Sequence, residues 1–222
     1  DSIADIPQEL IDEYQIQMIN LEILYKNMVY MDKLTINPSE LLKMSCDENE
    51  LPTSSQPNPK NIENLLDYLS TYYSSVIIMT VSKELSGTYN NFVNVSREFS
   101  KDNFKISVIN TMQNSGAQGL LVKKCAEYID AGLGHDEIVE LIRERTVRSK
   151  ILVQVRSLDN MIKSGRLSVK AGALAKKAGM KPVVTLDSNG KGALESVAFS
   201  IKGSNKKIIN HIRKILKTSC IE

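Results

Sequence analysis

One strand-to-helix passage decides the fold: Val76-Ile77-Ile78-Met79-Thr80-Val81, then Ser82-Lys83-Glu84-Leu85, then Ser86-Gly87-Thr88-Tyr89. The first run is apolar and rich in β-branched residues, which is typical of a buried parallel strand. The last run places two hydroxyls and a glycine where a helix begins. Backbone N–H groups at a helix start are unpaired, so Ser86, Gly87 and Thr88 are suited to hold a carboxylate or a phosphate. A plain helix cap is the alternative interpretation, because Ser and Thr are common N-cap residues.

A second hydroxyl-rich loop precedes the helix that leads to this strand: Thr53-Ser54-Ser55-Gln56-Pro57-Asn58-Pro59. Its two prolines restrict the residues before them to extended geometry, which favours a rigid loop. Open α/β sheets bind ligands beyond the carboxyl ends of their strands. We therefore expect both loops to meet at one edge of a sheet.

Strand-like and helix-like segments alternate along the chain, which predicts a parallel sheet with right-handed crossovers. The expected strands lie at 17–24, 76–81, 104–109 and 150–155, and the expected helices at 61–73, after Ser86, from Ser115 to Tyr128, and at 169–178. Strands at 180–186 and 193–199 are expected to form a hairpin around Asp187-Ser188-Asn189-Gly190. The helix at 169–178 is rich in Ala and Gly, which allows close packing or leaves room for a long apolar ligand.

The composition is that of a soluble globular protein, with 42% hydrophobic and 24% charged residues among 222. We expect no membrane span, no signal peptide and a cytoplasmic location. The three cysteines are far apart and lack neighbouring histidines, so we expect no disulfide framework and no metal site. Cys125 is expected to pack as a small apolar residue.

Charge is distributed unevenly. Residues 160–222 hold thirteen Lys or Arg against three acids, whereas residues 1–159 hold fifteen against twenty-three. A basic last third fits a nucleic acid, an acidic protein, attraction between two lobes, or simply a solvated face. We favour the solvated face and expect no nucleic-acid partner.

No general base is evident beside the hydroxyls. His135 and His211 are the only histidines, and each is expected to be solvated without a catalytic triad around it. A serine without a base is better suited to hydrogen bonding than to attack, so binding is favoured. The alternative is an enzyme that acts on a small phosphorylated or carboxylate metabolite, with Ser86 and Thr88 cradling the anion.

Four separated motifs together resemble the DegV family of bacterial lipid-binding proteins. They are the opening Asp1-Ser2-Ile3-Ala4-Asp5-Ile6-Pro7, Ser54-Ser55-Gln56-Pro57 where the family has Thr-Ser-Gln-Pro, Ser86-Gly87-Thr88, and Gly165-Arg166. The chain lacks the His-Thr-Gly-Pro-Gly stretch of that family.

The resemblance implies an α/β fold with two lobes: a Rossmann-like parallel-sheet lobe at 1–148, and a smaller lobe at 149–222 with a mixed or antiparallel sheet. It implies a long-chain fatty acid between the lobes and no other cofactor. It also implies that the protein is not itself an enzyme and presents the bound carboxylate to a separate fatty acid kinase. The residues expected at the carboxylate are Ser54, Ser55, Ser86, Gly87, Thr88 and Arg166, with Ser115, Gly116 and Gly165 as possible additions.

Overall fold

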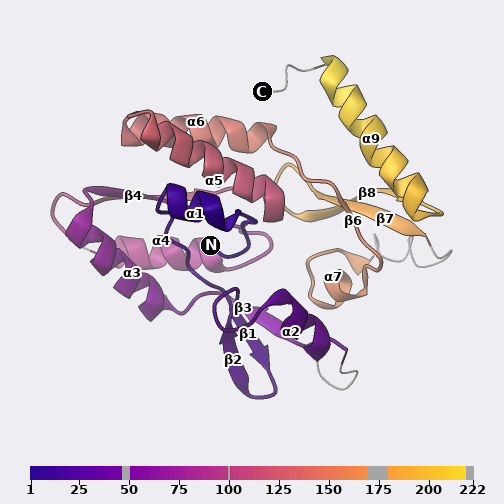
Figure 1. Ribbon diagram of the computed structural model, residues 1–222, viewed down its shortest axis with the longest axis horizontal. Coiled ribbons are helices and arrows are strands. Elements are labelled where there is room, and N and C mark those ends of the chain that lie inside the picture. Colours follow the sequence, from indigo (N-terminus) through magenta and orange to yellow (C-terminus); the bar gives the residue numbers. More distant parts are fainter. Residues whose placement is uncertain (47–50, 100, 170–179, 219–222) are drawn as a thin grey trace. The chain divides into compact units, whose positions relative to one another are not determined.

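A computed structural model describes residues 1–46, 51–99, 101–169 and 180–218 (Figure 1). The chain forms two compact units, Asp1–Ser149 and Lys150–Glu222. The helices of the first unit are α1 (Gln8–Glu13), α2 (Pro38–Met44), α3 (Pro59–Tyr72), α4 (Thr88–Glu98), α5 (Ser115–Asp130) and α6 (His135–Arg148). Its strands are β1 (Glu22–Tyr25), β2 (Met28–Met31), β3 (Thr53–Ser55), β4 (Ser75–Thr80) and β5 (Lys105–Asn110). The second unit contains β6 (Val153–Gln154), α7 (Asp159–Lys163), β7 (Lys181–Leu186), β8 (Gly192–Ala198) and α9 (Ile201–Thr218).

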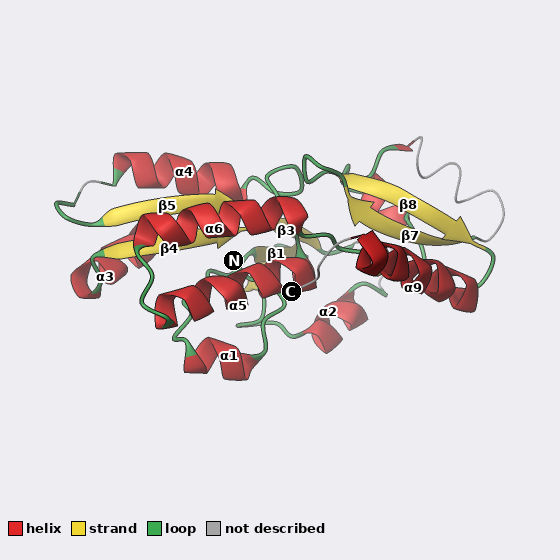
Figure 2. Ribbon diagram, turned by 90° about the horizontal axis from the view of Figure 1, so that it is seen from above, coloured by secondary structure: helices red, strands yellow, loops and turns green. Residues whose placement is uncertain are grey.

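The apolar run that follows α3 forms β4, which pairs with β5 in parallel (Figure 2). The register runs from Ser75 opposite Lys105 to Thr80 opposite Asn110. The carboxyl ends of both strands therefore lie at the same edge of the sheet. Beyond the ends, the hydroxyl of Thr111 donates to the carbonyl of Thr80 at 2.7 Å, which ties the two following loops together.

Apolar side chains cover both faces of this pair. Successive strand residues point to opposite faces, so Ile77 and Met79 pack in the cluster formed with α5 and α6, while Val76 and Ile78 pack in the cluster formed with α3 and α4. Helices α5 and α6 lie side by side (Figure 1). The buried residues of the first cluster are Met79, Ile109, Leu121, Cys125, Ile138, Val139 and Ile142, and those of the second are Ile19, Ile62, Leu66 and Phe92. Burial on both faces is typical of strands in parallel sheets and explains the continuous apolar run.

A separate antiparallel sheet has the order β2-β1-β3. Lys26 and Asn27 join β1 to β2, and both have positive φ (46° and 63°), as a two-residue type I′ hairpin loop requires. The prediction of a strand over 17–24 is wrong for residues 17–21, which have no regular secondary structure. The physical reason is that, among the described residues, no strand lies beside 17–21 to form a ladder with it.

The second unit has an antiparallel sheet in the order β6-β7-β8, so the predicted hairpin over 180–199 is confirmed. Its loop closes through the backbone N–H of Asp187, which donates to the carbonyl of Lys191 at 2.9 Å, and Gly190 supplies a positive φ of 85°. The parallel pair in the first unit and this antiparallel sheet confirm the predicted α/β fold class.

The expected small-residue helix over 169–178 lies almost entirely outside the described residues. Within the described parts of the chain, no helix has both the length and the apolar character needed to cross a bilayer.

We predict that Ile142→Ala lowers the free energy of unfolding by about 2–5 kcal/mol, because Ile142 is fully buried between α6 and the sheet and its truncation leaves a cavity. The matched control on the same helix is Val147→Ala, whose side chain is 76% exposed, with an expected change below about 0.5 kcal/mol. Urea unfolding of both variants measures the difference. Equal effects would contradict the packing described for α6.

Candidate functional site

The turn after β4 brings two hydroxyls together. The side-chain oxygens of Ser86 and Thr88 lie 2.8 Å apart, and the backbone N–H of Thr88 donates to Ser86 Oγ at 3.3 Å. Thr88 is fully buried, whereas Ser86 is partly exposed and Gly87 is exposed. Ser86 is therefore the hydroxyl of this pair that a ligand can reach.

Gly87 stands at the N-cap position of α4 and has no side chain to cap the helix, although Ser86 Oγ accepts the N–H of Thr88. The first N–H groups of a helix lack intrahelical partners, and the positive end of the helix dipole lies at the same place. This start of an eleven-residue helix is therefore favourable for an anion.

The first hydroxyl loop runs from β3 into α3. Ser54 and Ser55 pair with β1 opposite Ile23 and Glu22, and Ser54 is exposed. At the other end of the loop, the side chain of Asn58 accepts the backbone N–H of Lys60 at 2.9 Å and caps α3. Both ends of the loop are thus fixed by hydrogen bonds.

The two hydroxyl loops meet. The side-chain amide of Asn91 on α4 donates to the carbonyl of Pro57 at 2.7 Å, and this bond is buried. The carboxamide of Gln56 lies beside Gly87, so a side chain at 87 would have to push the exposed end of Gln56 aside. This contact and the Asn91–Pro57 bond bring the two loops together. The sequence patterns did not point to Gln56 or Asn91 as residues that join the loops. Gln56 does lie within the Ser-Gln-Pro motif, which could have indicated it.

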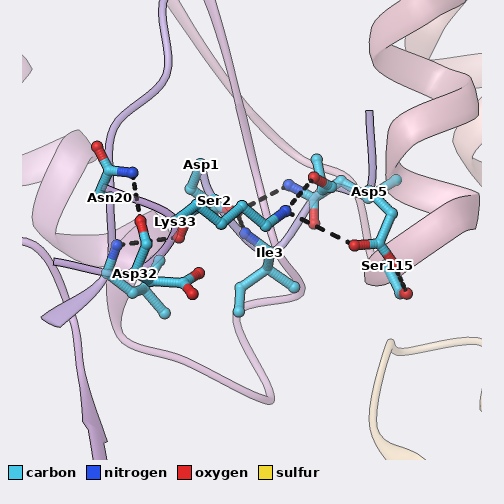
Figure 3. A network of polar contacts seen from close by, with 11 residues as sticks. Asp1, Ser2, Ile3, Asp5, Asn20, Asp32, Lys33 and Ser115 are labelled. Atoms are coloured by element: carbon cyan, nitrogen blue, oxygen red, sulfur yellow. Dashed lines mark hydrogen bonds and ion pairs between the residues drawn. The ribbon is translucent and has the colours of Figure 1, made fainter. Parts of the chain in front are cut away.

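Ser115 is engaged by the opening loop of the chain. Its hydroxyl donates to the carboxylate of Asp5, and its carbonyl accepts the backbone N–H of Asp5 at 3.3 Å (Figure 3). A Cβ on neighbouring Gly116 meets nothing within 4 Å. The hydroxyl proton of Ser115 is therefore already used within the protein.

Figure 3 also shows Asp1 and Lys33 in this polar network. The carboxylate of Asp1 accepts the backbone N–H of Val81 at 2.8 Å and the side-chain amide of Gln118 at 3.0 Å. The ammonium of Lys33 donates to the carbonyl of Ala4 at 3.0 Å. The bond from Val81 to Asp1 fixes the backbone just after β4, five residues before Ser86.

The Gly165-Arg166 pair lies in the second unit. Gly165 has a φ of 75°, which favours glycine, and it ends the short helix α7. The partly buried Arg166 donates from its guanidinium to the carbonyl of Ser164 at 2.9 Å.

His135 belongs to the first unit and His211 to the second. His135 is partly buried and bonds Ser107 at 2.8 Å, so the expectation of a solvated side chain is wrong for it. Burial lowers its pKa, as does the charge of Lys105. His211 lies 3.2 Å from the carboxylate of Glu195.

Cys125 packs in the first cluster, as predicted, and burial raises the pKa of its thiol to about 11. The thiolate that a nucleophile requires is therefore disfavoured. In the described ranges, no three His, Cys, Asp or Glu side chains come together as metal ligands.

Comparison with known proteins gives consistent matches. The model of the DegV family, described as "Uncharacterised protein, DegV family", matches residues 1–220. The chain is 30% identical over 217 residues to a DegV domain-containing protein of Clostridium acetobutylicum, covering 97% of this chain and 76% of that protein. It is 28% identical over 219 residues to the protein DegV of Bacillus subtilis, covering 97% and 75%.

Two solved structures have similar folds. A stearic acid-binding protein from Eubacterium ventriosum matches with a TM-score of 0.89 at 23% identity, over 98% of this chain and 75% of that one. A DegV family protein from Thermus thermophilus, whose structure is described by its fatty acid binding, matches with a TM-score of 0.85 at 25% identity, over 96% and 75%.

We predict that Asn91→Ala lowers the free energy of unfolding by about 1–3 kcal/mol, because it leaves the buried carbonyl of Pro57 without its donor. Asn90→Ala, an exposed neighbour on the same helix, is the control. Chemical unfolding measures both. If Asn91→Ala lowers the free energy of unfolding no more than Asn90→Ala does, the bond between the loops does not hold them together.

Proposed function

Because this chain belongs to the DegV family, as its motifs predict, we propose that it binds a long-chain fatty acid and holds the carboxylate at its two hydroxyl loops. The head-group contacts in this proposal come from Ser54, Ser55, Ser86 and Gly87, and Arg166 adds a positive charge. Thr88 is fully buried, so it acts by orienting the hydroxyl of Ser86. Ser115 is left out because its only hydroxyl proton goes to Asp5.

The observation that carries the proposal is the junction of the loops. Gln56 lies beside Gly87, and the side chain of Asn91 bonds the carbonyl of Pro57, so the loop that carries Ser54 and the turn that carries Ser86 are joined. A carboxylate accepts several hydrogen bonds, and bonds to charged groups are stronger than neutral ones. The start of α4, at the exposed Gly87, adds the positive end of the helix dipole to the same place.

The relatives support the choice of ligand. The Thermus thermophilus family member, 25% identical to this chain, is described by its fatty acid binding. The acyl chain supplies much of the affinity in such a complex, since each buried methylene contributes about 0.8 kcal/mol. Retention of the ligand therefore needs no covalent bond.

The proposal assigns binding, and no catalytic step, to this chain. The hydroxyl of Ser86 has another hydroxyl, Thr88, as its neighbour, and neither can act as a general base at neutral pH. Conversion of the bound carboxylate to an acyl phosphate would belong to a separate fatty acid kinase that uses ATP.

Native mass spectrometry of the delipidated protein titrated with palmitate tests the proposal. We predict that Ser86→Ala and Ser54→Ala each weaken binding by about 10- to 100-fold, because each removes one hydrogen bond to a charged group, worth about 1.5–3 kcal/mol. Ser45→Ala, an exposed serine at the end of α2, should leave the affinity unchanged. A protein that neither retains nor takes up palmitate would refute the function.

Arg166 is tested separately. Arg166→Gln should weaken binding at low salt more than at high salt, whereas the exposed control Arg156→Gln should have no effect. Unchanged affinity for Arg166→Gln would remove the arginine from the head-group site and leave the hydroxyl loops as the binding site.

A further inference from the structure

The loop that follows β5 holds the turn that carries Ser86. The side-chain oxygen of Asn110 accepts the backbone N–H of Lys83 at 3.1 Å. The carbonyl of Gln113, from the same loop, accepts the backbone N–H of Ser82 at 2.9 Å. Two consecutive backbone groups at the start of the turn are therefore fixed from the neighbouring strand.

Within the turn, the backbone of Ser82 fixes Ser86. Its carbonyl accepts the backbone N–H of Leu85 at 2.9 Å and that of Ser86 at 3.2 Å. Ser82 is fully buried, so it has little room to move. A displacement of Ser82 or Lys83 would therefore displace Ser86 as well.

Asn110 is itself held in a defined orientation. Its side-chain oxygen also accepts the backbone N–H of Met112 at 3.1 Å, which is the local bond of an Asx turn. Only the oxygen of a carboxamide accepts hydrogen bonds, so these two donors decide which atom faces the turn. Both acceptor positions of that oxygen are used within the protein. Asn110 therefore acts on the turn and does not donate to a ligand through this atom.

From this series of bonds we propose that Asn110 is a positioning residue for the fatty acid head group. It holds the turn after β4 so that the hydroxyl of Ser86 and the start of α4 are in place before the ligand binds. The inference rests on the proposed function, because Ser86 is the contact through which Asn110 acts. A turn that is already ordered loses less conformational freedom on binding, and the affinity is higher for that reason.

The pairing of β4 with β5 does not depend on the side chain of Asn110. Thr111 donates its backbone N–H and its hydroxyl to the carbonyl of Thr80, at 3.2 and 2.7 Å. These bonds remain when the side chain at 110 is shortened. Asn110→Ala should therefore loosen the turn and leave the strand pair intact.

Hydrogen exchange of the ligand-free protein tests the first step. In Asn110→Ala, the backbone amides of Lys83 and Ser86 should exchange at least about tenfold faster, while that of Ile78 within β4 should be unchanged. Asn110→Asp keeps an acceptor oxygen at the same place, so this variant should retain the protection of both turn amides.

A double-mutant cycle with palmitate, measured by native mass spectrometry, tests the second step. Asn110→Ala alone should weaken binding by about 5- to 20-fold, the loss expected for about one hydrogen bond. In the Ser86→Ala protein the same change should weaken binding by less than about twofold, because both substitutions act through one hydroxyl. The matched control is Ser107→Ala, which removes the bond to His135 from the same strand and should leave the affinity unchanged.

Three results would overturn this proposal while the fatty acid function stands. They are unchanged exchange of the Lys83 and Ser86 amides in Asn110→Ala, losses of affinity that add fully in the double variant, and an equal loss of affinity in Ser107→Ala. A wild-type chain that binds no palmitate would instead refute the proposed function, and this inference with it.

Discussion

The carboxylate of Asp1 makes the interaction on which the first unit depends. It accepts hydrogen bonds from the backbone of Val81 and Ile3 and from the side chain of Gln118. The opening loop, the end of β4 and the first turns of α5 are thereby joined by one side chain. The turn that carries Ser86 follows Val81 directly, so these hydrogen bonds also position that turn.

The donors of the turn after β4 are neutral hydroxyl and backbone N–H groups. Residues 1–159 carry more acids than bases, fifteen Lys or Arg against twenty-three, so the long-range field of this part of the chain does not attract an anion. Hydroxyls and helix-start N–H groups act only at hydrogen-bond distance, and they add no charge that must be desolvated. The fatty acid proposed above suits such donors, because its apolar tail would supply much of the binding free energy.

The sequence predicted the elements whose signals are local. The apolar run at 76–81 became β4, and the turn residues at 187–190 became the loop of the β7–β8 hairpin. Residues 17–21 also contain apolar residues but form no strand. A β-strand needs a neighbouring strand to pair with, and the sequence of one segment does not specify that neighbour. The pairing of β3 with β1 was not predicted for the same reason, since alternation of helix and strand does not specify which strands become neighbours.

By itself, the sequence determined the α/β class, the family and the identity of the two hydroxyl loops, because these depend on periodicity and on short motifs. Only the tertiary structure decided that Gln56 lies beside Gly87, that Asn91 bonds the carbonyl of Pro57, and that Ser115 donates its hydroxyl proton to Asp5. Each of these contacts joins segments that are more than thirty residues apart, or depends on the absence of a side chain at the point of approach. Such contacts are fixed by packing in three dimensions, and no local pattern of residues specifies them.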